Sequence, residues 1–254
     1  MQKIIFSIPF TGKTPNSETQ TQQWFDFRAN VFEEYTLKSL MNQTDKDFLI
    51  WIQFKPSDKN NKATIKIRKA LNKSKLEYVM TFNGPIMMED KATWHNKDLI
   101  ERATKSLKEL EPIKEDYVVL VGLDSDDMVH AKFVEVLKEK TPRKHGAYYM
   151  TKGFVYSMDG RLSEWENPES MSIYAVVYPT DIFLDAKKHF EHQRGLNTHE
   201  QIPKLFDAEK LPDGLYCATI HGTNISTVWG HPFMGKEYYY ADEVESIIKD
   251  FKIN

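Results

Sequence analysis

In the first half of the chain, short and almost wholly apolar segments alternate with longer segments whose apolar residues recur at helical spacing. Helices are predicted over Arg28–Gln43, Lys62–Leu71, Lys97–Leu110 and around His130–Glu139, with a loop over Thr11–Gln23. Strands are predicted over Lys3–Pro9, Phe48–Phe54, Glu77–Phe82 and Tyr117–Leu123. Strands that are apolar along their length are buried on both faces. The alternation therefore predicts an α/β fold with a mostly parallel central sheet flanked by helices.

The second half has a different texture, with more turn residues between its apolar segments. Strands are predicted over Gly146–Tyr156, Ser172–Tyr178 and Leu215–Ile220, and helices over Asp181–Phe190 and Glu237–Phe251. The stretch Asp159–Pro168 is predicted to consist of turns. No linker long enough to separate domains is evident, so one domain over residues 1–254 is expected, with a mixed α+β C-terminal region.

Composition narrows the classes of function. Hydrophobic residues make up 41% of the 254 residues and charged residues 28%, which is typical of a globular protein. The net charge of −3 excludes an overall basic field that would recruit nucleic acid. The lysine-rich stretch Lys55–Lys75 fits either a solvated face or a rim that attracts an anionic nucleotide-sugar.

The expected location is the cytoplasm. The single cysteine, Cys217, excludes an internal disulfide and fits a reducing compartment. The apolar run at the N-terminus is too short for a signal peptide, and no stretch approaches the roughly 20 apolar residues of a transmembrane segment.

The candidate chemistry lies directly after the strand Tyr117–Leu123, in the sequence Asp124-Ser125-Asp126-Asp127. Carboxylates this close repel one another, and one usually takes up a proton unless a cation or hydrogen-bond donors compensate. Hard oxygen ligands on a short loop suit Mg²⁺ or Mn²⁺, ions that often carry a substrate's phosphates. Ligands of parallel sheets bind beyond the carboxyl ends of the strands. The sequence therefore predicts a metal–diphosphate site here, with Asp124, Asp126 and Asp127 as metal ligands.

Other sites that use acidic loops or short motifs do not fit. Met128 and Val129 stand where a calcium-binding EF-hand loop requires a ligand and a glycine. The chain contains neither a P-loop nor a dinucleotide fingerprint. It also lacks a cysteine pair for zinc and the GxSxG motif of serine hydrolases.

Two segments carry a family resemblance. Tyr35–Ile52, YTLKSLMNQTDKDFLIWI, is similar to the first helix and second strand of GT-A glycosyltransferases, which flank the nucleotide pocket. Val119–Leu137, VLVGLDSDDMVHAKFVEVL, is similar to their DxD segment. In this order the segments resemble the bacterial putative rhamnosyltransferase group, and HGTNIST, from His221 to Thr227, extends the match more loosely.

The resemblance implies a GT-A-like fold and a sugar transfer. Residues 1–140 would bind a nucleoside-diphosphate sugar, and residues 141–254 a glycan or other saccharide acceptor. A hexosyl group, rhamnosyl among the candidates, would pass to a glycan hydroxyl with Mn²⁺ or Mg²⁺, in surface-polysaccharide assembly and with inversion.

The resemblance also suggests residue roles. Arg28, Asp58, Asp124 and Ser125 are candidates for binding the donor, although the usual acidic residue directly after the second strand is absent and Asp58 lies a few positions later. His221 is a candidate last metal ligand, with His199 and His231 as competitors.

An inverting transfer needs a carboxylate that takes the proton of the acceptor hydroxyl. Glu164 and Glu166 are the candidates, on an expected acceptor loop where Trp165 could stack on a sugar.

Two other functions are compatible with the same residues. A phosphohydrolase of the haloacid dehalogenase type also places a DxD after an apolar strand, but usually near the start of the chain and with a downstream lysine and acidic pair. A non-catalytic sugar- or nucleotide-binding module would keep the aromatic residues without needing a metal.

Overall fold

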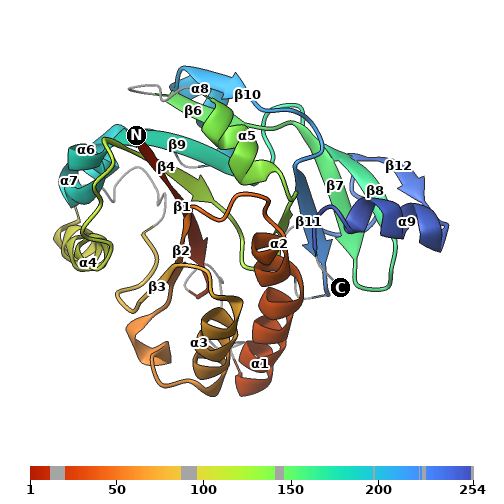
Figure 1. Cartoon of the computed structure of the whole chain (residues 1–254), viewed down its shortest axis with the longest axis horizontal. Helices are drawn as coiled ribbons and strands as arrows, with labels where there is room; N and C mark the ends of the chain where they lie inside the picture. Colours follow the sequence, from red (N-terminus) through yellow and green to blue (C-terminus); the bar gives the residue numbers. More distant parts are fainter. Residues whose placement is uncertain are drawn as a thin grey trace.

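The computed structural model describes residues 1–11, 21–86, 96–140, 146–196, 198–222, 224 and 227–252. Of the predicted loop Thr11–Gln23, residues 12–20 lie outside this part of the chain. The elements form a larger sheet, covered by helices on both faces, and a smaller sheet that carries the C-terminal helix (Figure 1).

The larger sheet has seven strands in the order β10-β6-β9-β4-β1-β2-β3. They are β1 (Gln2–Pro9), β2 (Leu49–Gln53), β3 (Tyr78–Thr81), β4 (Tyr117–Gly122), β6 (Gly146–Tyr149), β9 (Tyr174–Pro179) and β10 (Ala208–Lys210). β9 lies between β4 and β6 and runs antiparallel to both, whereas the other pairings in this sheet are parallel. The predicted mostly parallel α/β sheet is confirmed. The second half of the chain contributes three of its strands, so both halves share this sheet.

The two faces of the larger sheet are buried under different helices. One face packs on α1 (Gln22–Val31), α2 (Lys38–Met41), α3 (Lys62–Ser74) and α5 (Phe133–Glu139), and the other on α4 (Lys97–Lys108), α6 (Thr180–Leu184) and α7 (Ala186–His192). Within β1, Ile4 and Phe6 belong to the first core and Ile5 to the second. Two covered faces explain why the strands are apolar along their length. A π-helical segment, Phe32–Leu37, joins α1 to α2.

The smaller sheet has the order β12-β8-β7-β11-β5. Its strands are β5 (Met128–Val129), β7 (Lys152–Ser157), β8 (Leu162–Glu166), β11 (Tyr216–Ile220) and β12 (Met234–Tyr238). The C-terminal helix α9 (Ala241–Ile248) packs beside it through Val244 and Ile248. β5 follows β4 after five residues, so the acidic loop connects the two sheets.

Two predictions about the strands of the second half were wrong. The predicted strand Gly146–Tyr156 is two strands, β6 and β7, in different sheets. At the break, the carbonyls of Met150 and Thr151 accept hydrogen bonds from Met171 and Asn167, so the ladder of β6 does not continue. The turn-rich stretch Asp159–Pro168 contains the strand β8 after a tight turn at Gly160 (φ +93°).

The helices of the second half are also shorter than predicted. Asp185 interrupts the predicted helix Asp181–Phe190, because its carboxylate caps α7 by accepting from the amides of Lys187 and Lys188. The predicted helix Glu237–Phe251 begins only at Ala241, since Glu237 and Tyr238 pair with β8. Within the described residues, no helix is long and apolar enough to cross a membrane.

Candidate functional site

The acidic loop is positioned from both sides by backbone pairing. β4 pairs with β1 up to Gly122 opposite Ser7, and β5 pairs with β11 through Met128 opposite Cys217. The loop between β4 and β5 therefore lies at the carboxyl end of the central strand. There the end of β11 also brings His221 close to it.

A buried glutamine and its neighbours hold the segment that follows the loop. Gln43 is 2% exposed; its Nε2 donates to the carbonyl of His130 at 2.8 Å and its Oε1 accepts from the amide of Val134 at 3.1 Å. Thr44 donates its amide to the carbonyl of Ala131 at 2.8 Å. The Gln-Thr pair of the family-like motif thus clamps the chain between β5 and α5, and so supports the acidic loop.

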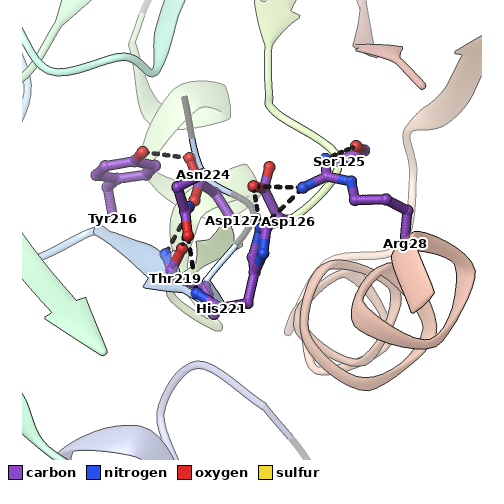
Figure 2. A network of polar contacts seen from close by, with 8 residues as sticks. All are labelled: Arg28, Ser125, Asp126, Asp127, Tyr216, Thr219, His221 and Asn224. Carbon is purple, nitrogen blue, oxygen red and sulfur yellow. Dashed lines mark hydrogen bonds and ion pairs between the residues drawn. The ribbon is translucent and has the colours of Figure 1, made fainter. Parts of the chain in front are cut away.

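The centre of the site is a contact of three charged or polar side chains from distant parts of the sequence (Figure 2). Nη1 of Arg28 lies 2.8 Å from Oδ2 of Asp126 and 2.8 Å from Nε2 of His221, and these two atoms lie 2.7 Å apart. Nη2 of Arg28 donates to Oγ of Ser125 at 2.7 Å. The structure thus brings Arg28, Ser125, Asp126 and His221 together, as members of one polar cluster.

Burial makes this cluster electrostatically strong. Asp126 is 9% exposed and His221 8% exposed. Burial alone would raise the pKa of Asp126, but the hydrogen bond with His221 and the charge of Arg28 outweigh it and hold that pKa well below its usual range. Asp126 is therefore a carboxylate at neutral pH, compensated by the guanidinium.

Asp127 points away from this cluster into a separate network. Its Oδ2 accepts a hydrogen bond from the hydroxyl of Tyr216, and its Oδ1 accepts from the amide of Thr219 at 3.0 Å. Burial and the neighbouring charges of Asp126 and Asp124 raise its pKa well above the usual value, and these two donors oppose the rise only in part. The two adjacent carboxyl groups therefore have pKa values displaced in opposite directions.

The loop that carries His221 is fixed by an asparagine. The amide of His221 donates to Oδ1 of Asn224 at 2.7 Å, and Nδ2 of Asn224 donates to the carbonyl of Thr219 at 2.7 Å (Figure 2). Gly222 has φ +79°, a conformation that favours glycine. In the segment HGTNIST, residues 223, 225 and 226 lie outside the described part of the chain.

Asp124, the third carboxylate, lines a cavity of about 320 Å³ that does not include Asp126 or Asp127. Ser7 and Gly122 line it from β1 and β4, Ser172 from the segment before β9, and His199 from the segment after α7. Oγ of Ser172 is also hydrogen-bonded to the hydroxyl of Tyr216, which donates to Asp127. The cavity is thus connected to the buried carboxyl group through two hydroxyls.

The last residue of β4 is a glycine, which leaves room for an aromatic ring. A Cβ on Gly122 would lie 2.9 Å from Cζ of Tyr174, which pairs with it on β9 and lines the same cavity. Glycine is therefore required at this position by close packing rather than by its backbone angles.

The remaining predicted residues lie elsewhere. Asp58 is buried and accepts hydrogen bonds from Thr11 at 2.7 Å and Ser57 at 2.9 Å, which tie the segment after β2 to the end of β1. Asp58 lies beyond the ends of β1 and β2, but it does not line the cavity. His231 packs against the ring of Trp165, with centroids 4.8 Å apart.

Glu164 and Glu166 are not brought into the site. Both are exposed on β8, where Glu164 accepts from the hydroxyl of Tyr238 at 3.1 Å and Glu166 lies 3.1 Å from Nζ of Lys152. β8 is separated from β11 by β7, and neither glutamate lines the cavity. The assignment of a proton-accepting role to them stays a prediction without support from the geometry.

Whether the predicted ligands can bind a divalent metal depends on how their side chains lie. Nη1 of Arg28 contacts both Asp126 and His221, which also contact each other, and Asp127 is turned toward Tyr216. Among the described residues, no group of three or more histidine, cysteine, aspartate or glutamate side chains is arranged to hold a metal ion. As they stand, these side chains do not fit a metal held by protein ligands alone, and Mn²⁺ or Mg²⁺ stays a prediction.

Comparison with known proteins bears on the same residues. Residues 16–228 match the model of a family described as putative rhamnosyl transferase. The chain belongs to the putative rhamnosyl transferase family. The match spans Arg28 and the acidic loop and includes His221, so it contains the whole polar cluster. The predicted family resemblance is confirmed, and the family makes the protein a sugar transferase, with a sugar donor and an acceptor.

None of the curated proteins matches the sequence. Among solved structures, a putative nucleotide-diphospho-sugar transferase from Desulfovibrio desulfuricans G20 is similar with a TM-score of 0.39 and 12% identity, over 84% of this chain and 80% of that one. The inositol-1-phosphate CTP transferase from T. maritima is similar with a TM-score of 0.36 and 9% identity, over 85% of this chain and 88% of that one. Membership of the family rests on the match over residues 16–228.

Sequence reasoning missed several members of the site. Tyr216 reads as an ordinary aromatic residue of a strand, and Asn224 as a loop residue. Ser172 carries no motif, and His199 was predicted only as a competing metal ligand. A signal existed only for Asn224, because asparagine near a glycine often hydrogen-bonds backbone in tight loops.

Proposed function

We propose that this protein moves a hexosyl group, with rhamnosyl as the first candidate, from a nucleoside-diphosphate sugar to a hydroxyl of a glycan. The observation that carries the proposal is the placement of Arg28. Its guanidinium is held by Asp126, Ser125 and His221 at the carboxyl end of the central strand, on the same loop whose first residue, Asp124, lines the cavity.

The hydrogen-bond donors of the Arg28 side chain support diphosphate binding. Its Nε is buried and has no hydrogen-bond partner among the described residues. An unsatisfied buried donor costs about 1–3 kcal/mol, which an oxygen of a bound ligand would remove. The planar guanidinium matches phosphate oxygens in geometry and charge. We therefore assign the diphosphate of the donor to Arg28.

The cavity suits the transferred sugar. Its volume of about 320 Å³ lies at the lower end of the range for small-molecule sites, roughly 300–1,000 Å³. Asp124 offers carboxylate oxygens to sugar hydroxyls on one side, and Ser172 a hydroxyl on another. Residues of the first half and of the second half both line it. This supports a division in which residues 1–140 bind the donor and residues 141–254 the acceptor.

The other parts of the proposal extend the family resemblance. We propose a cytoplasmic site of action, where nucleotide-sugars are made, and a role in surface-polysaccharide assembly with inversion at the sugar carbon. A requirement for Mn²⁺ or Mg²⁺ is proposed separately, because the arrangement of Arg28, Asp126 and His221 does not by itself provide a metal site.

A donor screen tests the proposal. The protein is incubated with UDP-, GDP- and dTDP-sugars and a panel of glycan acceptors, with Mn²⁺, with Mg²⁺ and with EDTA, and products are identified by mass spectrometry. Transfer from one donor class supports the proposal. Hydrolysis of simple phosphate esters instead would favour a phosphohydrolase. Glycan binding without turnover would favour a binding module.

A further inference from the structure

The cavity has a second polar wall besides the acidic loop. It comes from the segment after α7, where Thr198, His199 and Glu200 line the cavity that Asp124 lines from the end of β4. From the sequence, His199 was named only as a competing metal ligand, and Thr198 and Glu200 were not named. This wall belongs to the acceptor half of the chain.

The backbone of this wall is held by a capping box. The side chain of Thr198 accepts from the amide of Gln201, and the amide of Thr198 donates to Oε1 of Gln201 at 3.1 Å. His199 is the first residue of the short 3₁₀ helix that the box opens, His199–Gln201. Reciprocal capping of this kind fixes where the first side chains of the turn point.

The orientation and tautomer of His199 follow from one contact. Nδ1 of His199 lies 2.9 Å from the carbonyl oxygen of Ser170. A carbonyl can only accept, so Nδ1 carries the proton and donates it. In the neutral imidazole, Nε2 then carries a lone pair. His199 is half-buried and lines the cavity, so it offers a proton acceptor of fixed orientation there.

His221 and the two glutamates predicted to accept the proton, Glu164 and Glu166, each lack one of these properties. Nε2 of His221 is already in contact with Arg28 and Asp126. Glu164 and Glu166 are exposed on β8 and do not line the cavity.

We propose that Nε2 of His199 is the general base that accepts the proton of the attacking hydroxyl, an assignment that rests on the proposed function. The hydroxyl oxygen of the acceptor forms a bond to the anomeric carbon of the donor sugar. The bond from that carbon to the diphosphate oxygen breaks, and its electron pair leaves with the nucleoside diphosphate. The proton of the hydroxyl passes to Nε2, and the imidazolium later loses it to solvent.

The test compares His199→Ala, His199→Gln and Glu200→Gln with the wild type, and uses His231→Ala as the matched control outside the cavity. Rates are measured with the UDP-, GDP- or dTDP-sugar that gives product with the wild type. Loss of a general base typically lowers kcat by about 10²–10⁴-fold. We expect this loss in both His199 variants, with binding of the corresponding nucleoside diphosphate, measured by calorimetry, unchanged within about twofold.

Imidazole rescue distinguishes a proton acceptor from a structural residue. Added imidazole should restore part of the rate of His199→Ala and leave the rates of the wild type and His231→Ala unchanged. A rate within about tenfold of the wild type in His199→Ala, or a comparable loss confined to Glu200→Gln, would overturn the assignment and leave the transferase proposal intact. If the wild type transfers no sugar from any donor, the proposed function fails first and this assignment with it.

Discussion

The ion pair between Arg28 and Asp126 should contribute strongly to stability as well as to the site. The two side chains are each 12% exposed, and Nη1 and Oδ2 are 2.8 Å apart. With an effective dielectric constant of about 20 and charge centres about 4 Å apart, their attraction is on the order of 4 kcal/mol. Removing one partner leaves a buried charge, which typically costs about 3–5 kcal/mol.

A double-mutant cycle measures this attraction. We expect Arg28→Met and Asp126→Asn each to destabilise the protein. The double variant should lose about 2–4 kcal/mol less stability than the two single losses added together. His221 contacts both partners and will compensate part of each loss, which favours the lower half of that range. Chemical denaturation gives the free energies, and in a chain of 254 residues each kcal/mol should shift Tm by about 2–4 °C.

The control for this cycle is the pair Glu101 and Lys105, which is 2.7 Å apart but whose side chains are 67% and 60% exposed. The same cycle on this pair should give no resolvable coupling, since water screens exposed charges. A coupling between Arg28 and Asp126 as small as that of the exposed pair would refute the account of the cluster as buried and mutually compensated.

Three further predictions concern activity, packing and pH. Asp126→Asn should lower transfer at least 100-fold, since a neutral amide no longer anchors the Arg28 guanidinium; a rate near that of the wild type in the product assay would contradict the role of Asp126. Gly122→Ala should destabilise the protein by about 1–3 kcal/mol, because the new methyl group would meet the ring of Tyr174 at 2.9 Å; an unchanged denaturation midpoint would show that the ring moves aside freely. Burial lowers the pKa of His189 to about 4 from 6.5, so the unfolded chain binds the proton first, and stability should fall by about 3 kcal/mol as the pH drops from 6.5 to 4. His189→Phe, which keeps a ring stacked on Tyr178, should flatten that fall, and denaturation curves at several pH values would show whether it does.

The first half of the fold was predictable because its strands are buried on both faces and its helices carry clear apolar stripes. Lys62–Leu71 and Lys97–Leu110 were predicted close to the observed α3 and α4. The second half was harder, because β6 and β7 are nearly continuous in sequence yet pair in different sheets. Which strand each of them pairs with depends on where the rest of the chain lies, and the local hydrophobic pattern does not encode that position.

For the candidate site, the acidic loop and Arg28 stand out by charge and position, and His221 by its place after a strand. The opposite environments of Asp126 and Asp127 could not be read from two adjacent letters, because each depends on partners about 90 or more positions away. His199 was a candidate ligand, but its place in the cavity wall was hidden, since it is held by the backbone carbonyl of Ser170 and such a contact cannot be read from a sequence.

The amino-acid sequence by itself determined the alternation of buried strands and covering helices, the concentration of negative charge after the fourth predicted strand, and the family. These follow from local pattern and composition, which act over a few residues. The tertiary structure alone decided that a guanidinium compensates Asp126, that Asp127 faces a tyrosine, and that Glu164 and Glu166 lie outside the cavity while His199 lines it. Such outcomes depend on the approach of distant segments at distances below 3 Å, where burial strengthens each charge and each hydrogen bond.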